Sequence, residues 1–220
     1  MKLLLHPLPV RIFHWTMVTS VVILLATGFY IHHPPLWLQW PMSLVRKLHG
    51  CFGLILAVNL AGQVYYYIAT GKFTEVLLLP RDWAHMRSFL RYYLFVTEHH
   101  PNFGRYNPGQ KMLFTTWGLA VTTGTVTGLG LLFPDHSVWL QKALGGLSVL
   151  RAIQYSIGIF FVTTIPLHLY LVFTEEPAKL QAMFTGFLQK EPKLPVAADT
   201  ADKTGRSWES ELPGVQTEER

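Results

Sequence analysis

A single cysteine, Cys51, and a shortage of charged residues set the first limits on this sequence. Only 14% of its 220 residues are charged, 50% are hydrophobic and the mean hydropathy is +0.27, whereas about a quarter of the residues of a soluble domain carry charge. One cysteine excludes an intrachain disulfide, a CxxCH attachment site for c-type haem and a self-contained iron–sulfur cluster. We therefore expect a membrane protein, and any iron–sulfur centre that serves it must belong to a partner.

Acidic residues are absent from four long apolar stretches, at about 12–32, 48–69, 112–133 and 152–174. Each is long enough to cross a hydrocarbon core of ~30 Å as a helix that rises ~1.5 Å per residue. Backbone polar groups must pair internally in lipid, so all four are predicted to be helices. The first stretch has no small-residue cleavage site and is expected to be retained. The fold predicted for residues 1–190 is an all-α, integral-membrane four-helix bundle with up-down-up-down topology.

The basic residues predict the orientation of this bundle. Of the 18 lysines and arginines, 14 lie in the N-terminal segment, the second loop and the C-terminal segment, and four lie in the other two loops. By the positive-inside rule both termini are cytoplasmic, which predicts a multi-pass membrane protein with an even number of spans. The formal charge of +5 reflects this topology, so a nucleic-acid partner is not expected. The four basic residues on the outer side are Arg46, Lys47, Lys142 and Arg151.

Two segments outside the spans have a distinct composition. Residues 82–96 place apolar and aromatic residues at helical spacing around Arg87 and Arg91, which predicts an amphipathic helix on the inner membrane surface. Residues 191–220 are polar and contain prolines, and they are predicted to form a disordered tail.

Two histidines lie inside the apolar stretches, where an ionisable side chain is costly unless something uses it. His14 is near the inner end of the first stretch and His168 near the inner end of the fourth, so they occupy the same leaflet. Two facing helices that present imidazoles at one depth can hold a haem iron. Gly28 and Gly158 offer small surfaces where the bundle opens for the macrocycle. The alternative is that each imidazole hydrogen-bonds to a neighbouring helix.

A third histidine, His49, opens the second stretch near the outer face, where it is a candidate ligand of a second haem. Its partner is expected 14 residues before His168, which is ~21 Å along the helix and on nearly the same face. That position holds Gln154, and an amide is a poor ligand for haem iron. Either another residue replaces it, or the protein holds one haem, or His49 is an ordinary interfacial residue. Six further histidines are weak outer candidates (His32, His33, His136) or solvated loop residues (His85, His99, His100).

Several segments match a known pattern. They are RIFHWT and a following TG in the first stretch, RKLHGCFG opening the second, LPRD and GRYNPGQKMLF before the third, VTGLGLL within it and PLHLYLVF in the fourth. Over about residues 5–190, their order and spacing resemble the four-helix b-type cytochrome (gamma) subunit of respiratory formate dehydrogenases. The cytochrome subunits of nickel-iron hydrogenases, in the bacterial cytochrome b561 family, and of thiosulfate reductase are more distant relatives of this pattern.

The resemblance implies the cofactors and partners. It makes His14 and His168 the axial ligands of an inner haem b and His49 a ligand of an outer haem b, whose second ligand position is Gln154 here. Electrons would arrive from a periplasmic iron–sulfur subunit, attached to the catalytic subunit of the complex, and leave to a membrane quinone near the inner haem. The function predicted is therefore electron transfer and quinone reduction at the cytoplasmic side, with substrate oxidation in a partner.

The quinone site implied by the resemblance maps onto Asn107 and Gly109, with His168 next to it. Asn107 offers side-chain hydrogen bonds to a quinone carbonyl, and Gly109 permits close approach of the backbone. Arg105 and Lys111 flank this segment and are candidates for pairing with haem propionates. Taken alone, YNPGQ is an ordinary turn signal before a helix.

Two other functions are kept open. Within the cytochrome class, the alternative is a subunit of a nickel-iron hydrogenase or a thiosulfate reductase type complex. Outside it, the alternative is a haem-free membrane anchor or small transporter whose histidines form a polar network. The absence of acidic residues from the spans weakens the transporter alternative, because proton and cation pathways normally need one.

Overall fold

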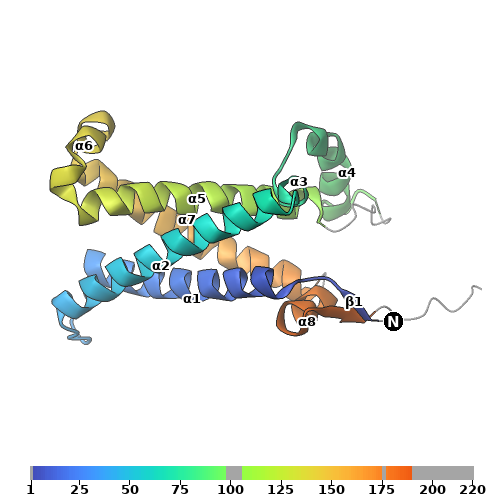
Figure 1. Ribbon diagram of the computed structural model, residues 1–220, viewed down its shortest axis with the longest axis horizontal. Helices are drawn as coiled ribbons and strands as arrows, with labels where there is room; N and C mark the ends of the chain where they lie inside the picture. The colour runs from blue at the N-terminus through green and yellow to red at the C-terminus, as the bar shows by residue number, and fades with distance from the viewer. Residues whose placement is uncertain (1, 98–105, 175–176, 190–220) are drawn as a thin grey trace, which may run out of the picture.

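The structure is a computed structural model in which residues 2–97, 106–174 and 177–189 are described (Figure 1). The predicted tail at 191–220 lies outside these residues. Four long helices dominate: α1 (Leu8–His32), α2 (Met42–Ala69), α5 (Pro108–Leu132) and α7 (Leu147–Thr174). α1 packs along α2 and α5 packs along α7, and the two pairs meet through contacts of α2 with α5 and of α1 with α7.

Short elements lie at both ends of the long helices. Strands β1 (Lys2–Leu4) and β2 (Phe187–Gln189) pair antiparallel and place the first and last described residues side by side. α8 (Pro177–Thr185) precedes β2. We call the end with β1, β2 and α8 the terminal end and the opposite end the loop end. Between α2 and α5 lie α3 (Phe73–Val76), the 3-10 helix η1 (Pro80–Asp82) and α4 (Trp83–Tyr93), and between α5 and α7 lie η2 (Pro134–His136) and α6 (Val138–Leu144).

Each long helix begins four to six residues before the apolar stretch that predicts it. Hydropathy detects the apolar part of a helix, whereas its first turn also accepts polar residues and proline. At α5, Asn107 caps the helix: its Oδ1 accepts from the Gln110 N–H at 2.8 Å, and its own N–H donates to Gln110 Oε1 at 3.1 Å. Pro108 then occupies the first helical position, where its missing N–H is not needed.

The centre of the bundle is apolar. One buried residue from each long helix contributes to a single cluster, formed by Val21, Leu56, Val121 and Phe161. Packing of this kind requires all four helices to meet at mid-length. The cluster separates the terminal end from the loop end, so groups at the two ends belong to different sites.

Three of the four long helices, α1, α2 and α7, are apolar and long enough to cross a membrane. α5 is as long as α1, with 25 residues. Its segment TTWGLAVTTGTVTG is rich in threonine and glycine, which lowers the mean hydropathy of the helix. The described chain is thus almost entirely helical, with three apolar span candidates. The expectation of an all-α fold misses the two strands, because three-residue strands are too short to show a periodicity of two.

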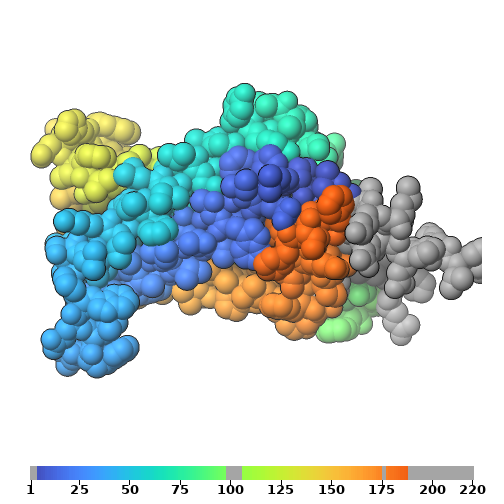
Figure 2. All heavy atoms as spheres, turned by 60° about the horizontal axis from the view of Figure 1, so that its bottom comes forward, coloured from blue at the N-terminus to red at the C-terminus, as the bar shows by residue number. Residues whose placement is uncertain are grey.

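The terminal end is closed by a contact between the N-terminal segment and α8 (Figure 2). The N–H groups of Leu5 and His6 donate to the Gly186 carbonyl at 2.9 and 3.1 Å. Arg11 Nε donates to the Met183 carbonyl at 3.2 Å, and its Nη2 donates to the Phe184 carbonyl. Gly186 has a φ of +88°, which ends α8 and favours glycine. Arg11 therefore caps α8 with the side chain of a residue in α1.

Candidate functional site

His14 and His168 come together at the terminal end. His14 lies six residues after the first residue of α1, and His168 lies six residues before the last residue of α7. Both side chains are half-buried, and the imidazoles are near enough for the charge on one to act on the other. Two helices thus each place an imidazole at the same end of the bundle.

Tryptophans flank both imidazoles. The Trp15 ring meets the His14 ring edge-on, with centroids 5.1 Å apart, and the Trp117 ring lies 5.2 Å from the His168 ring. The Trp117 indole N–H donates to Thr164 Oγ1 at 2.9 Å, so its orientation is fixed by α7 itself. Sequence reasoning missed this role of Trp117, because nothing in its segment distinguishes it from a membrane-facing tryptophan.

The donor set at this end fits a haem. Nδ1 of His14 is buried and has no hydrogen-bond partner among the described residues. Leaving such a group unsatisfied costs roughly 1–3 kcal/mol, and a neutral imidazole nitrogen is a good metal ligand. The described residues form no group of three or more His, Cys, Asp or Glu suited to a metal ion. A haem requires only two axial side chains because the porphyrin supplies the other ligands, so a pair of imidazoles meets its needs.

His49 lies at the other end of the bundle, on α2, and faces α1. Its Nδ1 is 2.8 Å from Thr27 Oγ1. A β-carbon at Gly28 would lie 3.3 Å from Cε1 of His49, so the imidazole covers the surface of α1 that the sequence suggested for a macrocycle. The second such surface, Gly158, is covered in the same way by Leu25 and Phe29 of α1. Gly28 therefore permits a close approach of the His49 ring, whereas a β-carbon at Gly158 would make only ordinary contacts, at 3.7 and 3.8 Å.

Gln154 lies on α7 and faces α5. Its Nε2 donates to the Gly124 carbonyl at 2.6 Å and to Thr127 Oγ1 at 3.0 Å. A β-carbon at Gly128 would lie 3.0 Å from the same nitrogen. The amide thus joins α7 to α5, and its nitrogen is used in that contact.

The other histidines occupy separate places. His32 stacks on Tyr155 of α7, with ring centroids 4.3 Å apart. His32, His33, His85 and His136 are exposed, while His99 and His100 lie outside the described residues. His6, which the sequence did not single out, is only 3% exposed and lies against Gly186 at the terminal end. Among the described residues, no contact joins any of these histidines to His49.

The segment that begins α5 is organised by contacts within the protein. Asn107 caps the helix, as described above. At Gly109 the Phe89 ring of α4 packs so closely that a β-carbon would overlap it. The Lys111 ammonium lies 2.8 Å from Oδ1 of Asp82, a carboxylate partner that replaces the propionate suggested by the sequence. Arg105 lies outside the described residues.

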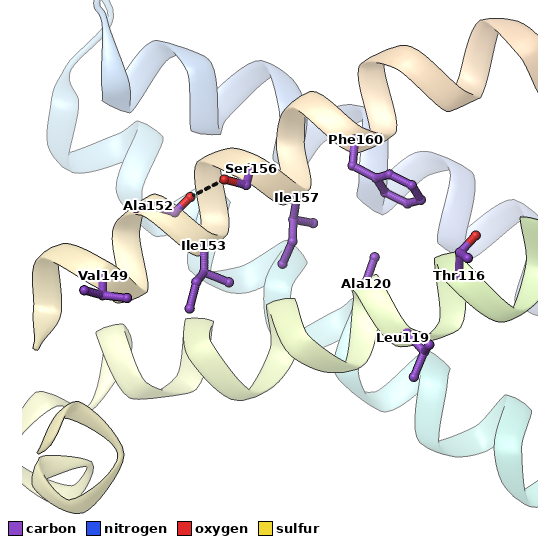
Figure 3. A pocket seen from close by; sticks show the side chains of 9 residues that line it. All are labelled: Thr116, Leu119, Ala120, Val149, Ala152, Ile153, Ser156, Ile157 and Phe160. Atoms are coloured by element: carbon purple, nitrogen blue, oxygen red, sulfur yellow. Dashed lines mark hydrogen bonds between the residues drawn. The ribbon is translucent and has the colours of Figure 1, made fainter. Parts of the chain in front are cut away.

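A groove lies elsewhere, on the outer surface between α5 and α7 (Figure 3). Its volume is about 500 Å³, and its walls are mainly aliphatic, with Ile153, Ile157 and Phe160 from α7 facing Leu119 and Ala120 from α5. None of the predicted site residues lines it. The groove is therefore separate from the candidate site.

Comparisons with known proteins bear on these sites. A family model described as prokaryotic cytochrome b561 matches residues 5–186. The chain is 24% identical over 198 residues to the probable Ni/Fe-hydrogenase B-type cytochrome subunit of Azotobacter vinelandii, covering 80% of this chain and 82% of that protein. It is 23% identical over 189 residues to the corresponding protein of Cupriavidus necator, covering 76% and 78%.

A third relative is the probable Ni/Fe-hydrogenase 1 B-type cytochrome subunit of Escherichia coli K12. It is 22% identical over 166 residues, covering 70% of this chain and 67% of that protein. All three relatives are named as subunits of a hydrogenase. The similarity therefore favours the hydrogenase alternative, and it gives no support to the formate dehydrogenase branch that the motifs suggested.

Proposed function

Because the chain belongs to the prokaryotic cytochrome b561 family, we propose that it is the membrane cytochrome b subunit of a nickel-iron hydrogenase type complex. Its role is to carry electrons between the partner subunits of that complex and membrane quinone. Oxidation of the substrate takes place in a catalytic partner, which passes electrons through an iron–sulfur subunit. The names of the relatives support this choice over a formate dehydrogenase or thiosulfate reductase complex.

The proposed arrangement in the membrane has four spans. α1, α2 and α7 qualify by length and hydropathy, and α5 joins them because it has 25 residues and packs against α2 and α7. The terminal end carries both ends of the described chain, and the distribution of basic residues places that end at the cytoplasm. The protein is then an up-down-up-down bundle of the bacterial cytoplasmic membrane, with His49 and Gln154 toward the periplasm.

His14 and His168 are the proposed axial ligands of the inner haem b. The single observation that carries this proposal is their convergence from α1 and α7, with a buried ring nitrogen of His14 left without a partner. Trp15 and Trp117 each pack against one of the two rings. A haem bound there supplies one-electron redox chemistry.

His49 is the proposed ligand of an outer haem, whose second axial ligand does not follow the family pattern. The quinone is proposed to bind at the terminal end, near Asn107, Gly109 and His168. Since Phe89 fills the space beside Gly109, the glycine serves the packing of α4 against α5, and Phe89 contributes to the wall of that region. Electrons then cross from the loop end to the terminal end, which generates membrane potential when quinone takes its protons from the cytoplasm.

Two measurements on the tagged chain purified from its own membranes test the proposal. A reduced-minus-oxidised spectrum should show a b-type band, and mass spectrometry should identify the large subunit of a nickel-iron hydrogenase among the copurified proteins. Absence of the band would make the chain a haem-free anchor. Copurification of formate dehydrogenase subunits would return the partner assignment to the one suggested by the motifs.

A further inference from the structure

The α1–α2 pair and the α5–α7 pair match in helix length and in the positions of their polar residues near the loop end. α1 and α5 both have 25 residues, and Thr27 and Thr127 each lie five residues before the last one. α2 and α7 both have 28 residues, and His49 and Gln154 each lie seven residues after the first one. The matched positions also make matched contacts: Thr27 with His49, and Thr127 with Gln154.

The Thr27 hydroxyl determines which nitrogen of His49 carries the proton. Its oxygen is 2.6 Å from the Ile23 carbonyl and 2.8 Å from Nδ1 of His49. A carbonyl oxygen only accepts, so the single hydroxyl proton must lie between Thr27 and Ile23. Nδ1 of His49 therefore carries its own proton and donates it to Thr27 Oγ1. The lone pair of the imidazole is then on Nε2.

Gln154 uses its amide in the opposite way. Thr127 donates its hydroxyl proton to the Thr123 carbonyl at 2.7 Å, so Thr127 Oγ1 accepts one N–H of Gln154. The other N–H goes to the Gly124 carbonyl. Both amide protons are committed to α5, and the nitrogen of an amide has no lone pair available for a metal. Where His49 offers a ring nitrogen, the matched position offers none.

We propose that the Thr27–His49 and Thr127–Gln154 pairs are the two halves of one outer haem site in which His49 is the only strong axial ligand. Thr27 is a positioning residue that keeps Nε2 of His49 unprotonated. Gln154 leaves the second axial position without an imidazole, so the iron held there is high-spin and takes an added ligand. This inference rests on the proposed function and names the ligand set of its outer centre.

The first test uses the purified full-length chain in detergent. A pyridine haemochrome assay should give two haems per chain, and electron paramagnetic resonance of the oxidised protein should show one low-spin and one high-spin ferric haem. Adding imidazole should convert only the high-spin signal. One low-spin haem per chain that survives His49→Ala would overturn the inference and also remove the outer haem from the proposed function, whereas two low-spin haems would overturn the inference alone. Either result would leave the inner haem and the electron-transfer role standing. A chain without haem would overturn both.

Gln154→His tests the matched geometry directly. A histidine at this position finds the Thr127 hydroxyl as acceptor for its Nδ1–H and Gly128 as space for its ring, as His49 does at Thr27 and Gly28. The variant should convert the high-spin signal to a second low-spin signal with two haems per chain retained. Gln154→Leu, which removes the amide without adding a ligand, is the control and should stay high-spin. A Gln154→His protein that stays high-spin would contradict the pairing of the two positions.

Thr27→Val and Thr27→Ser separate positioning from packing. Valine has nearly the shape of threonine but accepts no hydrogen bond, so His49 loses the acceptor that raises its basicity. The midpoint potential of the high-spin haem should rise in Thr27→Val and return toward the wild-type value in Thr27→Ser. The low-spin haem should keep its potential in both variants. Equal potentials in all three proteins would remove Thr27 from the site.

Discussion

The Lys111 ammonium lies 2.8 Å from Oδ1 of Asp82, which joins the first turn of α5 to the segment leading into α4. Oδ2 of the same carboxylate accepts the Leu79 N–H at 2.8 Å. Burial raises the pKa of Asp82, but the hydrogen bonds from Lys111 and Leu79 and the charges of Lys111 and Arg81 outweigh it, so the pKa lies below its ordinary value. This pair fixes the position of α4 at the terminal end.

Asp82 therefore makes a pH-dependent contribution to stability. A carboxyl whose pKa is lower in the folded state stabilises above its unfolded pKa of ~3.9, and that contribution disappears as the pH falls through the folded value. Asp82→Asn should lower the stability by about 1 kcal/mol at pH 7. Thermal unfolding of both proteins in detergent checks this, and the difference between them should shrink below about pH 4. A difference that stayed constant down to pH 3 would contradict the ion pair.

Gly109 is required by Phe89. A β-carbon at Gly109 would overlap the Phe89 ring, whereas one at Gly118 would meet no side chain among the described residues. Gly109→Ala should displace α4 and speed amide hydrogen exchange over residues 83–93. Gly118→Ala should leave this exchange unchanged, and it should stabilise α5 by up to ~1 kcal/mol because alanine is the better helix former. Equal exchange in the two variants would show that Phe89 does not depend on Gly109.

Arg11 holds α8 against α1 through the Met183 and Phe184 carbonyls. Arg11→Met keeps much of the aliphatic stem and removes the donors, and each hydrogen bond to a charged group contributes roughly 1.5–3 kcal/mol. We expect faster hydrogen exchange in α8 and unchanged exchange in the loop-end half of α7. Arg11→Lys, which keeps the charge but not the forked donors, should recover only part of the protection. Full recovery would mean that charge alone holds α8.

The long helices were predictable because a segment that crosses the hydrocarbon core must be helical and apolar over about 20 residues. The apolar runs locate α1, α2, α5 and α7 to within a few residues at their ends, and the helical spacing around Met86 locates α4. The first turns were missed because they contain residues such as Pro9, Arg46 and Lys111, which a search for apolar runs excludes. The strands and α8 depend on contacts between Leu4 and Phe187, 183 residues apart, which no local pattern records.

The positions of the candidate residues along the helices could be predicted from the sequence, but their contacts could not. Helical periodicity gives the depths of His14, His49, Gln154 and His168, since depth follows directly from residue number. It does not say that Thr27 sets the tautomer of His49, because threonine in a membrane helix usually bonds only to its own backbone. Such partners depend on which helices are neighbours, and that is settled by packing of the whole bundle.

The most direct test is the low-spin haem signal in His14→Ala and His168→Ala, measured by electron paramagnetic resonance with the haem-to-chain ratio. His136→Ala, a change of an exposed histidine at the loop end, is the control. If His14 and His168 share one iron, either change abolishes the low-spin signal, while the control retains it. A low-spin signal of full intensity in His14→Ala or His168→Ala would contradict this account.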